Sequence, residues 1–477
     1  MESTADRFVD NAHRALGNEI LQQALGHVRV NFIEKRRQAV EALPEFEALR
    51  QAGRDLRDRV LADLDTHLLA FEAKVLEHGG QVHWCADADA ARNKILEICR
   101  EAGARRVTKG KTMIGEEIGI NDFLAAHDIE PVETDLGEYI IQLRHEAPSH
   151  LVAPAVHVTQ KQVEETFRQA HRDLDATRDL SEPRSLLSEA RAKLRQKFVT
   201  ADVGITGANF LVAETGSSVI VTNEGNGDLT QTLPRVHIAL ASIDKVVPTL
   251  DDLTVLLRLL ARSATGQEMS VYTTLSTGPR REEDHDGPGA YHVVLLDNGR
   301  SKMLGTPKQD LLRCIRCAAC LNHCPVYQAV GGHAYGWVYA GPIGAALTPA
   351  LIGLDHAADL PNASTLCGRC EAVCPMQIPL PDILRHWREE EFNNKTTKPD
   401  RAPQPVRRGL RLWAFLARHP RLYRLATGIG RRVLAGRAGR SGRLDKVPLA
   451  EGWTVSRDLP APSRRGFHAQ YRKGYRG

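Results

Sequence analysis

The sequence predicts an α/β domain with a mostly parallel sheet, preceded by a helical lead and followed by a cysteine-rich helical module and a basic helical tail. Three observations predict this organisation. Short apolar runs alternate with amphipathic stretches between about residues 80 and 300, which is typical of a parallel sheet covered by helices. Seven of the nine cysteines lie between Lys308 and Ile383. From Arg401 onward, nineteen Lys and Arg stand against three acidic residues.

Length and charge set the broad class. With 477 residues, the chain is long enough for two or three domains, each with a core of its own. No run approaches the roughly 18 apolar residues of a membrane span, and the N-terminus shows no basic-then-apolar signal pattern. The net charge of +4 combines about +16 beyond Arg401 with about −12 in the rest of the chain. We therefore expect a cytoplasmic protein whose basicity belongs to the tail.

Residues 1–79 form the helical lead. Leu, Val, Ile and Phe recur at spacings of three and four in NEILQQALGHVRVNFIEKRRQAVEAL and in LRDRVLADLDTHLLAFEAKVLEH. This period is typical of amphipathic helices, and Pro44 separates the two stretches. We expect the lead to pack on the α/β domain that follows.

Residues 80–300 form the α/β domain. QVHWC, ARRVTKG and IEPVETD predict three strands, separated by helices in DADAARNKILEICREAG, which opens on an Asp cap, and in GEEIGINDFLAAHD. Helix-rich sequence from Lys161 to about Gln196 interrupts the alternation. The pattern then resumes with the strands DVGITGANF, SSVIVTNEG and HIALASIDKVV, the helix DDLTVLLRLLARSA and the strand YHVVLLDN.

Several polar residues lie where these strands end, which is where open α/β sheets place their ligands. Lysine ammonium groups and the backbone N–H groups of the glycine-rich TNEGNGD could hold a carboxylate or a phosphate there. Tight turns demand the same Asn and Gly residues, so simple turn chemistry stays open as an alternative. No catalytic residue can be assigned. The candidate ligand-binding residues are Lys109, Lys111, Glu214, Asn223 and Asn226, and Glu116, Glu117, Glu133 to Glu138, Asn209 and His237 lie in similar positions.

The cysteines form two runs. The first is C-x2-C-x2-C-x3-C followed by Pro325, which is the bacterial ferredoxin pattern, and the second ends in the same way at Pro375. In that pattern three thiolates take one cluster and the fourth crosses to the other. The position of a fourth cysteine in the second run holds Ser364. The spacing therefore predicts a 4Fe–4S cluster on Cys314, Cys317, Cys320 and Cys374, and a 4Fe–4S or 3Fe–4S cluster on Cys324, Cys367 and Cys370, with Ser364 as a further candidate ligand.

Zinc sites and disulfides are the alternatives for seven clustered cysteines. Zinc takes four ligands and would leave three of these thiols without a role. Disulfide frameworks belong mainly to small secreted chains. We therefore expect iron–sulfur clusters. Cys85 and Cys99 each stand alone in apolar sequence, and we expect both to be small hydrophobic residues in a core.

The cysteine-rich module spans residues 301–395, and the linker and tail span residues 396–477. Between the cysteine runs, GGHAYGWVYAGPIGAALTP predicts an inserted helix and loop, and DILRHWREEEFNN predicts a closing charged helix. KTTKPDRAPQP is a proline-rich linker. Beyond it, VRRGLRLWAFLARHPRLYRLATGIGRRVLAG predicts a basic amphipathic helix or pair. Three roles stay open for these helices: binding to the inner face of a membrane, docking to a partner, or covering the cysteine-rich module. Nucleic-acid binding is not expected, because no recognisable reader fold accompanies it.

Long, ordered motifs resemble those of one family. The segments KGKTMIGEEIGIN, ETDLGEYIIQL, PSHLVAPAVH, ADVGITGANFLVAETGSSVIVTNEGNGDLTQTLPRVHIAL and LLRLLARSATGQ, followed by both cysteine runs, resemble the lactate utilization protein B family. The resemblance implies a LUD domain similar in fold to the glucosamine-6-phosphate deaminase, ribose-phosphate isomerase and CoA-transferase group, and a double-cluster ferredoxin module. It also implies two partners, a cysteine-rich subunit like those of heterodisulfide reductase and a smaller LUD-domain protein.

The resemblance implies a role in L-lactate oxidation. Converting a 2-hydroxy acid to a 2-oxo acid removes two electrons, whereas an iron–sulfur cluster normally passes one at a time. The sequence contains no G-x-G-x-x-G fingerprint, no P-loop and no G-x-S-x-G elbow. We therefore expect an electron-transfer subunit that delivers electrons toward a respiratory acceptor. Two alternatives stay open, namely a LUD domain that itself binds and oxidises a small 2-hydroxy acid, and an iron–sulfur regulatory protein.

Overall fold

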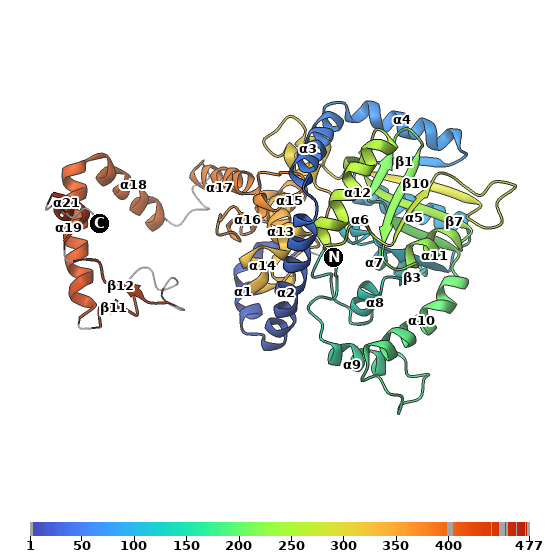
Figure 1. Ribbon diagram of the computed structural model, residues 1–477, viewed down its shortest axis with the longest axis horizontal. Coiled ribbons are helices and arrows are strands. Elements are labelled where there is room, and N and C mark those ends of the chain that lie inside the picture. The colour runs from blue at the N-terminus through green and yellow to red at the C-terminus, as the bar shows by residue number, and fades with distance from the viewer. Residues whose placement is uncertain are drawn as a thin grey trace. The chain divides into compact units, whose positions relative to one another are not determined.

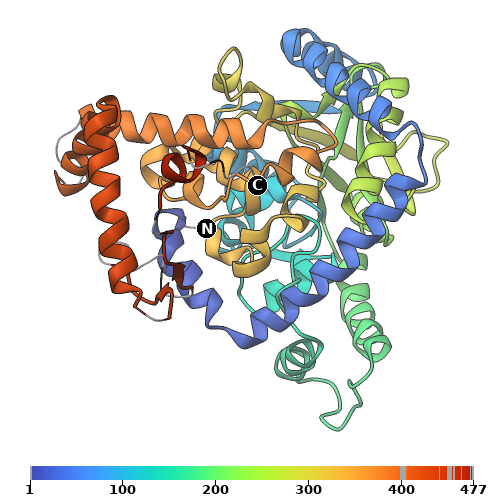
Figure 2. The same ribbon diagram turned by 60° about the vertical axis from the view of Figure 1, so that its left-hand side comes forward.

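The computed structural model describes residues 3–397, 404–439, 441–447, 454, 457–463, 465–472 and 474. The chain divides into two compact units, Met1–Glu391 and Phe392–Gly477 (Figures 1 and 2). No helix within these described ranges is both long and apolar enough to cross a membrane.

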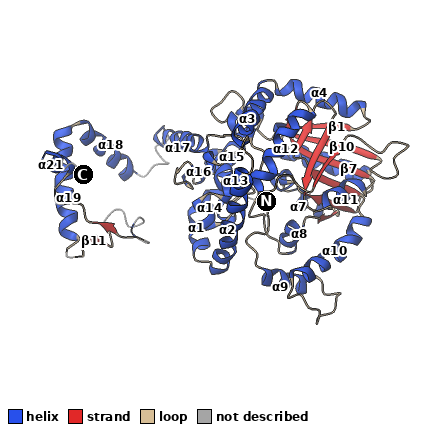
Figure 3. Ribbon diagram, viewed as in Figure 1, coloured by secondary structure: helices blue, strands red, loops and turns tan. Residues whose placement is uncertain are grey.

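A six-stranded sheet lies at the centre of the α/β domain in the order β1-β10-β7-β4-β2-β3 (Figure 3). Every neighbouring pair is parallel, so the predicted parallel α/β architecture is confirmed. Buried Val, Ile and Leu dominate its inner strands, because helices or a second layer cover both faces. The strands are β1 Gln81–Cys85, β2 Arg106–Gly110, β3 Glu130–Glu133, β4 Val203–Gly207, β7 Val236–Ser242 and β10 Ala290–Leu296.

Helices α5, α6 and α7 cover one face of this sheet. Asp87 caps α5 as predicted, because its side chain accepts a hydrogen bond from the Ala90 N–H. The stretch predicted as one helix over 115–128 is two helices, since Gly119 adopts a left-handed backbone with φ 63° between them. Cys85 and Cys99 are buried in this core, as predicted. The helices are α5 Ala88–Glu101, α6 Met113–Ile118 and α7 Ile120–Ala125.

The opposite face packs against helices and a smaller sheet of order β8-β5-β6-β9. The run HIALASIDKVV, predicted as one strand, divides here: β7 ends at Ser242 and the chain re-enters the smaller sheet as β8. Strand β9 was not predicted, because its half-exposed Thr and Ser residues lack an apolar pattern. The elements are α3 Phe46–Ala62, α4 Leu64–Glu77, α11 Asn226–Thr232, α12 Leu250–Ala264, β5 Phe210–Val212, β6 Ser217–Thr222, β8 Val246–Val247 and β9 Tyr272–Ser276.

The predicted helix-rich interruption forms a separate small core beside β3. Thr159 opens α9 with a capping box, in which its hydroxyl and the Gln162 side chain satisfy each other's backbone N–H groups. This excursion places the loop of residues 147–156 over the carboxyl end of the sheet, where it helps to line a cavity. Its helices are α8 Leu136–Leu143, α9 Gln160–Ala170 and α10 Pro183–Val199.

The helical lead divides between two neighbours. Helices α3 and α4 pack on the α/β domain, as expected for the lead. Helix α2 Glu19–Glu41 packs both on α12 of that domain and on α14 Pro325–Val330 of the cysteine-rich module, and α1 Phe8–Leu16 lies against the module (Figure 1). Arg36 in α2 donates a hydrogen bond of 2.8 Å to the Val373 carbonyl beside the second cysteine run. An amphipathic period predicts a helix but does not identify the surface that its apolar face covers, which explains the difference.

The cysteine-rich module is built from short helices that share one continuous hydrophobic core with the α/β domain. The inserted helix predicted between the cysteine runs is present as α15, and the closing charged helix is present as α17. The helices are α13 Ala319–Asn322, α14 Pro325–Val330, α15 Gly341–Ile352, α16 Arg369–Ala372 and α17 Leu380–Thr397, with 3-10 turns η3 Ser301–Met303, η4 Gln309–Arg313, η5 His333–Tyr335, η6 Leu354–His356 and η7 Leu360–Asn362. Two further 3-10 turns lie outside the module, η1 Ala5–Arg7 in the lead and η2 Ile243–Lys245 in the α/β domain.

The second unit contains the predicted pair of basic helices, α18 Gln404–Arg418 and α19 Pro420–Arg437. Leu412, Trp413 and Leu425 are exposed on these helices, among arginines. Most of the predicted proline-rich linker lies outside the described residues. The remaining elements of this unit are β11 Arg443–Leu444, β12 Leu459–Pro460 and α21 Phe467–Arg472.

Candidate functional site

Four cysteines drawn from both runs line one small cavity in the cysteine-rich module. Cys314 follows η4, Cys320 lies in α13 and Cys374 follows α16, and Cys317 completes the group. Apolar side chains, including Ile343, enclose the rest of the space. The crossover spacing in the sequence predicted these four residues as one ligand set, and the structure brings them together.

The environment of these thiols fits a bound iron–sulfur cluster. Burial, and after it the neighbouring thiols of Cys374 and Cys314, raises the pKa of the Cys317 thiol to about 12. Burial likewise raises the pKa of Cys374 to about 11. Four such sulfurs cannot all be charged without a compensating cation, and coordination to a metal removes the thiol protons.

The remaining three cysteines of the two runs form a second set. Burial, and after it the Cys324 thiol, raises the pKa of Cys370 to about 12. Burial also raises the pKa of Cys324, and Cys367 contributes to that increase. The Cys324 thiol therefore interacts electrostatically with both Cys367 and Cys370, as expected for one ligand set, and their shared role as ligands stays a prediction. In the part of the chain that the structure describes, no three His, Cys, Asp or Glu side chains form a site for a single metal ion.

The two cysteine runs fold as a structural repeat. Arg316 and Ala318 adopt left-handed backbone in the first run, with φ 60° and 61°. Leu366 and Gly368 do so at the matching positions of the second run, with φ 53° and 78°. Non-glycine residues rarely adopt this conformation, so its repetition shows that the cysteine-bearing turn itself requires it.

This repeat makes Ser364 the counterpart of Cys314. The Arg316 backbone N–H donates a hydrogen bond of 3.4 Å to Cys314 Sγ, and the Leu366 backbone N–H donates one of 3.1 Å to Ser364 Oγ. The serine oxygen therefore has the same local backbone partner as a predicted ligand sulfur. Its role as a ligand stays a prediction.

Arginines from the helical lead contact the backbone that carries Cys374. Arg50 Nε and Nη2 donate hydrogen bonds of 3.1 and 2.7 Å to the Cys374 carbonyl. Arg36 is buried nearby, and burial lowers its pKa while the Cys317 thiol partly offsets this change. The lead therefore supplies both cover and positive charge at the first cysteine set.

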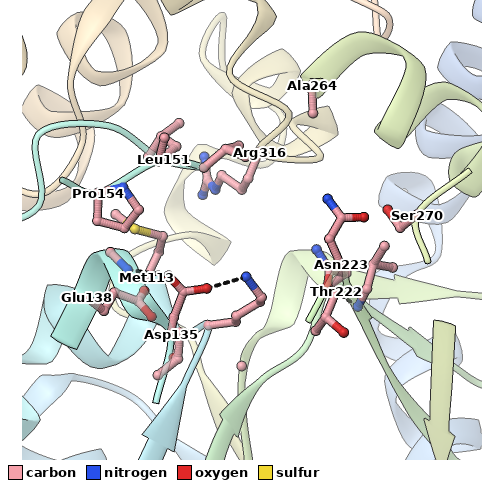
Figure 4. A pocket seen from close by; sticks show the side chains of 18 of the residues that line it. Met113, Asp135, Glu138, Leu151, Pro154, Thr222, Asn223, Ala264, Ser270 and Arg316 are labelled. Carbon is pink, nitrogen blue, oxygen red and sulfur yellow. Dashed lines mark hydrogen bonds and ion pairs between the residues drawn. The ribbon is translucent and has the colours of Figure 1, made fainter. Parts of the chain in front are cut away.

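A second cavity of about 580 Å³ lies at the carboxyl ends of β2, β3 and β4. Residues after these strands form its floor, and the loop of residues 147–156 and the end of α12 form much of its sides. Arg316, from the first cysteine run, extends into it from the side opposite Asp135 (Figure 4). The cavity therefore lies between the α/β domain and the cysteine-rich module, which share one core.

Two of the five candidate ligand-binding residues line this cavity, namely Lys111 and Asn223. The Lys111 ammonium already pairs with Asp135 at 2.5 Å, the interaction drawn in Figure 4, and with Glu224 at 3.4 Å. Burial lowers the Lys111 pKa, but these two carboxylates outweigh it and raise the pKa overall. The two carboxylates therefore neutralise the Lys111 ammonium, which makes it a poor binding group for an anionic ligand.

The other three candidates do not line the cavity. Lys109 is buried beneath it, where its ammonium pairs with Glu116 at 2.5 Å and Glu133 at 2.7 Å. Glu214 accepts a hydrogen bond from the N–H of Leu250 at the start of α12. Asn226 is buried at the start of α11. The sequence places these residues at strand ends among turn residues, but it does not show which of their side chains point into the cavity.

Lys245 and Arg316 line the cavity but were not predicted from the sequence. Lys245 is 6% exposed, and burial lowers its pKa to about 8, with Asp244 acting in the opposite direction. A charged Asp–Lys pair inside the apolar run HIALASIDKVV was the available signal, because buried charges are rare without a role. Arg316 lies between Cys314 and Cys317 in the sequence, and the cysteine pattern gives no separate signal for a ligand-binding arginine.

A buried polar network joins the two modules next to this cavity. Glu117 accepts hydrogen bonds from both terminal nitrogens of Arg300, at 2.9 and 2.7 Å, and from the Tyr339 hydroxyl at 2.5 Å. Burial raises the Glu117 pKa, but Arg300 outweighs it and holds the pKa below its usual range. Because Tyr339 belongs to the insert between the cysteine runs, the network fixes that insert against the α/β domain.

Comparisons with known proteins match all three parts of the chain. Residues 68–296 match the LUD domain, residues 310–378 match a 4Fe-4S dicluster domain and residues 398–474 match the C-terminal domain of lactate utilisation protein B. Among solved structures, a DUF162 family protein from Deinococcus radiodurans aligns with 49% of this chain and 98% of its own at 16% identity, with a TM-score of 0.26.

Full-length relatives carry the name lactate utilization protein B. The protein of that name from Oceanobacillus iheyensis is 40% identical over 98% of this chain and 97% of its own. The one from Bacillus pumilus is 40% identical over 99% and 98%, and the one from Bacillus subtilis is 39% identical over 98% and 96%. Identity at this level over nearly the whole length shows that the chain belongs to the lactate utilization protein B family.

Proposed function

We propose that this chain is the iron–sulfur electron-transfer subunit of a system that oxidises L-lactate to pyruvate. One observation carries the proposal: two sets of cysteines, spaced as in ferredoxins, come together in a chain that matches lactate utilization proteins along its whole length. Bound iron–sulfur clusters supply one-electron transfer. The sequence contains no dinucleotide fingerprint that would indicate a two-electron step within the chain.

We assign the two cluster sites as the crossover pattern requires. The first, of the 4Fe–4S type, is held by Cys314, Cys317, Cys320 and Cys374, which line one cavity. The second, a 4Fe–4S or 3Fe–4S cluster, is held by Cys324, Cys367 and Cys370, with Ser364 Oγ as the candidate fourth ligand.

The surrounding chain would control the properties of these clusters. Backbone N–H groups of Arg316 and Ile378 donate hydrogen bonds to Cys314 Sγ and Cys374 Sγ, at 3.4 and 3.5 Å. Hydrogen bonds to sulfur, nearby cations and exclusion of water are the features by which proteins set cluster potentials. Cys367 of the second set is exposed, whereas the four cysteines of the first set are buried or half-buried, so the second set has the cysteine most open to solvent.

We propose two protein partners and a docking role for the tail. The partners are a cysteine-rich subunit like those of heterodisulfide reductase and a smaller LUD-domain protein, as the family resemblance implies. The arginines and exposed apolar residues of α18 and α19 suit an anionic surface on a partner or on the cytoplasmic face of the membrane. The parallel sheet with helices on its faces also supports a fold relationship to the CoA-transferase group.

A reconstitution assay tests the relay function. The chain, purified anaerobically with its clusters, would be mixed with L-lactate and a redox dye, first alone and then with both partner subunits. We expect dye reduction only in the mixture, and we expect a Cys317→Ser variant to abolish it while still binding the partners. Full activity of the isolated chain would overturn the relay function and favour oxidation within the LUD domain.

A further inference from the structure

The cavity between the α/β domain and the cysteine-rich module has the size of a ligand site. Its volume of about 580 Å³ falls within the range of roughly 300–1,000 Å³ that is typical of small-molecule and cofactor sites. A three-carbon hydroxy acid would fill only a small part of it. Much of the lining is apolar, with Leu151, Leu260 and Ala264 among the side chains, so the space suits a ligand with an apolar body.

Two cations in the cavity wall, the buried Lys245 and the partly buried Arg316, have the Asp244 carboxylate near them but form no direct ion pair with it. Within the described residues, neither the Lys245 ammonium nor the Arg316 guanidinium forms a hydrogen bond or an ion pair with a carboxylate. Arg316 Nη1 is buried without a hydrogen-bond partner, and its guanidinium stacks on the Tyr339 ring at 4.9 Å. Buried charges normally have a partner, so this end of the cavity is suited to an incoming oxyanion.

The two ends of the cavity differ in charge. Asp135, Glu138 and Glu224 lie on the side formed by the strand ends and the loops that follow them, where Lys111 is already neutralised. Arg316 faces Asp135 and Glu138 from across the space (Figure 4). An anionic group would therefore be repelled from the carboxylate side and would bind at the end that holds Arg316 and Lys245.

Arginine at position 316 is not a requirement of the cysteine-bearing turn. Leu366 occupies the equivalent position of the structural repeat with nearly the same φ, 53° against 60° for Arg316. Among the cavity-lining residues, Arg316 is the one that belongs to the first cysteine run. Leu151 lines both this cavity and the space among Cys314, Cys317, Cys320 and Cys374. The cationic end of the cavity therefore adjoins the first cysteine set.

We propose that this cavity binds an anionic small molecule of cofactor size, with its carboxylate or phosphate group held by Lys245 and Arg316 and its apolar body against Leu151, Leu260 and Ala264. Arginine presents a planar fork of donors that matches either oxyanion, and a buried lysine adds a point charge. The proposal goes beyond the relay function, because a relay requires no ligand cavity. It also assigns the binding groups to residues other than those predicted from the sequence.

Calorimetric titration of the anaerobic, cluster-loaded chain tests the proposal with three probes: L-lactate for a carboxylate, inorganic phosphate for a phosphate, and flavin mononucleotide for a phosphate attached to a large apolar body. We expect at least one probe to bind with one-to-one stoichiometry. Arg316→Leu should weaken that binding by roughly 10- to 100-fold, because a charged hydrogen-bonding partner is lost. This variant should keep both clusters, because Leu366 shows that the turn accepts leucine.

A second variant and a control complete the experiment. Lys245→Met should weaken the same probe by a similar factor, whereas Lys302→Met, which changes an exposed lysine outside the cavity, should leave the affinity unchanged. Binding of none of the three probes would overturn the proposal, as would binding that neither cavity variant affects. If Arg316→Leu shifts only the cluster potential and no probe binds, the two cations serve to balance cluster charge and the proposal is wrong.

Discussion

At the scale of one residue, Ser364 stands in the second cysteine run where the first run has the predicted ligand Cys314. The second cysteine run reproduces the backbone of the first, including the hydrogen bond from the residue two positions onward, but presents an oxygen in place of a sulfur. A serine hydroxyl is a harder ligand than a thiolate and loses its proton far less readily. The second cluster should therefore hold one of its irons weakly.

We predict that Ser364→Cys strengthens the second cluster. The new thiolate would complete a set of four, so mild oxidation should no longer produce a three-iron form. Electron paramagnetic resonance of the oxidised protein would measure that form, with Ser364→Ala as the control in which it should persist. Full iron retention and no three-iron signal in the unchanged protein would show that another residue completes the site.

Tyr339 links the insert between the cysteine runs to the α/β domain through Glu117. Tyr339→Phe would keep the ring that stacks on Arg316 but remove one hydrogen bond to a buried carboxylate. We expect a loss of about 1.5–3 kcal/mol in the free energy of unfolding, measured by urea denaturation under anaerobic conditions. Tyr272→Phe, at a half-exposed position in β9, should change it by less than about 0.5 kcal/mol. An equally small effect of Tyr339→Phe would mean that Arg300 and Asn298 satisfy Glu117 without the tyrosine.

At the scale of the element, β7 carries a buried histidine that should make folding sensitive to acid. His237 lies within the sheet, hydrogen-bonded to Thr206 at 2.8 Å, and burial lowers its pKa to about 3. The unfolded chain has a histidine pKa of about 6.5 and so takes up the proton first as the pH falls. The stability that His237 contributes is therefore complete above pH 6.5 and is lost progressively as the pH falls toward 3.

We predict that this group lowers the free energy of unfolding by about 2 kcal/mol between pH 7 and pH 5, since each pKa unit corresponds to about 1.4 kcal/mol. Urea denaturation at both pH values would measure the loss, and His237→Gln should reduce it by a similar amount. His285→Gln, at an exposed loop position, serves as the control. An unchanged pH dependence in His237→Gln would show that other buried groups account for it.

The elements that could be predicted are those whose signal is local. Strands of buried Val and Ile, the Asp87 cap and the inserted helix α15 all follow from short stretches of sequence. The packing of α1 and α2 on the cysteine-rich module could not be predicted, because an apolar stripe does not identify its partner. The break at Gly119 depends on one backbone conformation inside an otherwise helical pattern.

The same division holds for the candidate sites. Ferredoxin spacing predicts the first cysteine set, because short loops bring Cys314, Cys317 and Cys320 together and the crossover pattern adds Cys374. The cavity depends instead on residues far apart in the chain: Lys245 follows β7, and Arg316 enters from another module. Lys109 and Lys111 have equally charged side chains, and only the fold shows that one lies beneath the cavity and the other lines it.

At the scale of the whole molecule, the predicted cluster-binding residues and the predicted docking helices lie in different compact units. The cysteines, the cavity and the shared hydrophobic core lie in the unit Met1–Glu391, and the basic helices lie in Phe392–Gly477. We predict that deleting residues 401–477 leaves the cluster absorbance intact while weakening attachment to partner subunits or to anionic lipid vesicles. Co-sedimentation and visible absorbance would measure the two effects. Loss of both clusters in the truncated chain would show that the tail is structural cover.

The relay function is tested most directly by freeze-quench electron paramagnetic resonance with L-lactate as the only reductant. In the assembled complex, we expect the signals of this chain's reduced clusters to appear within the time of one turnover. In the isolated chain, the same lactate should leave the clusters oxidised, although dithionite reduces them. Lactate-dependent reduction of the clusters in the isolated chain, at the rate seen in the complex, would contradict the relay function.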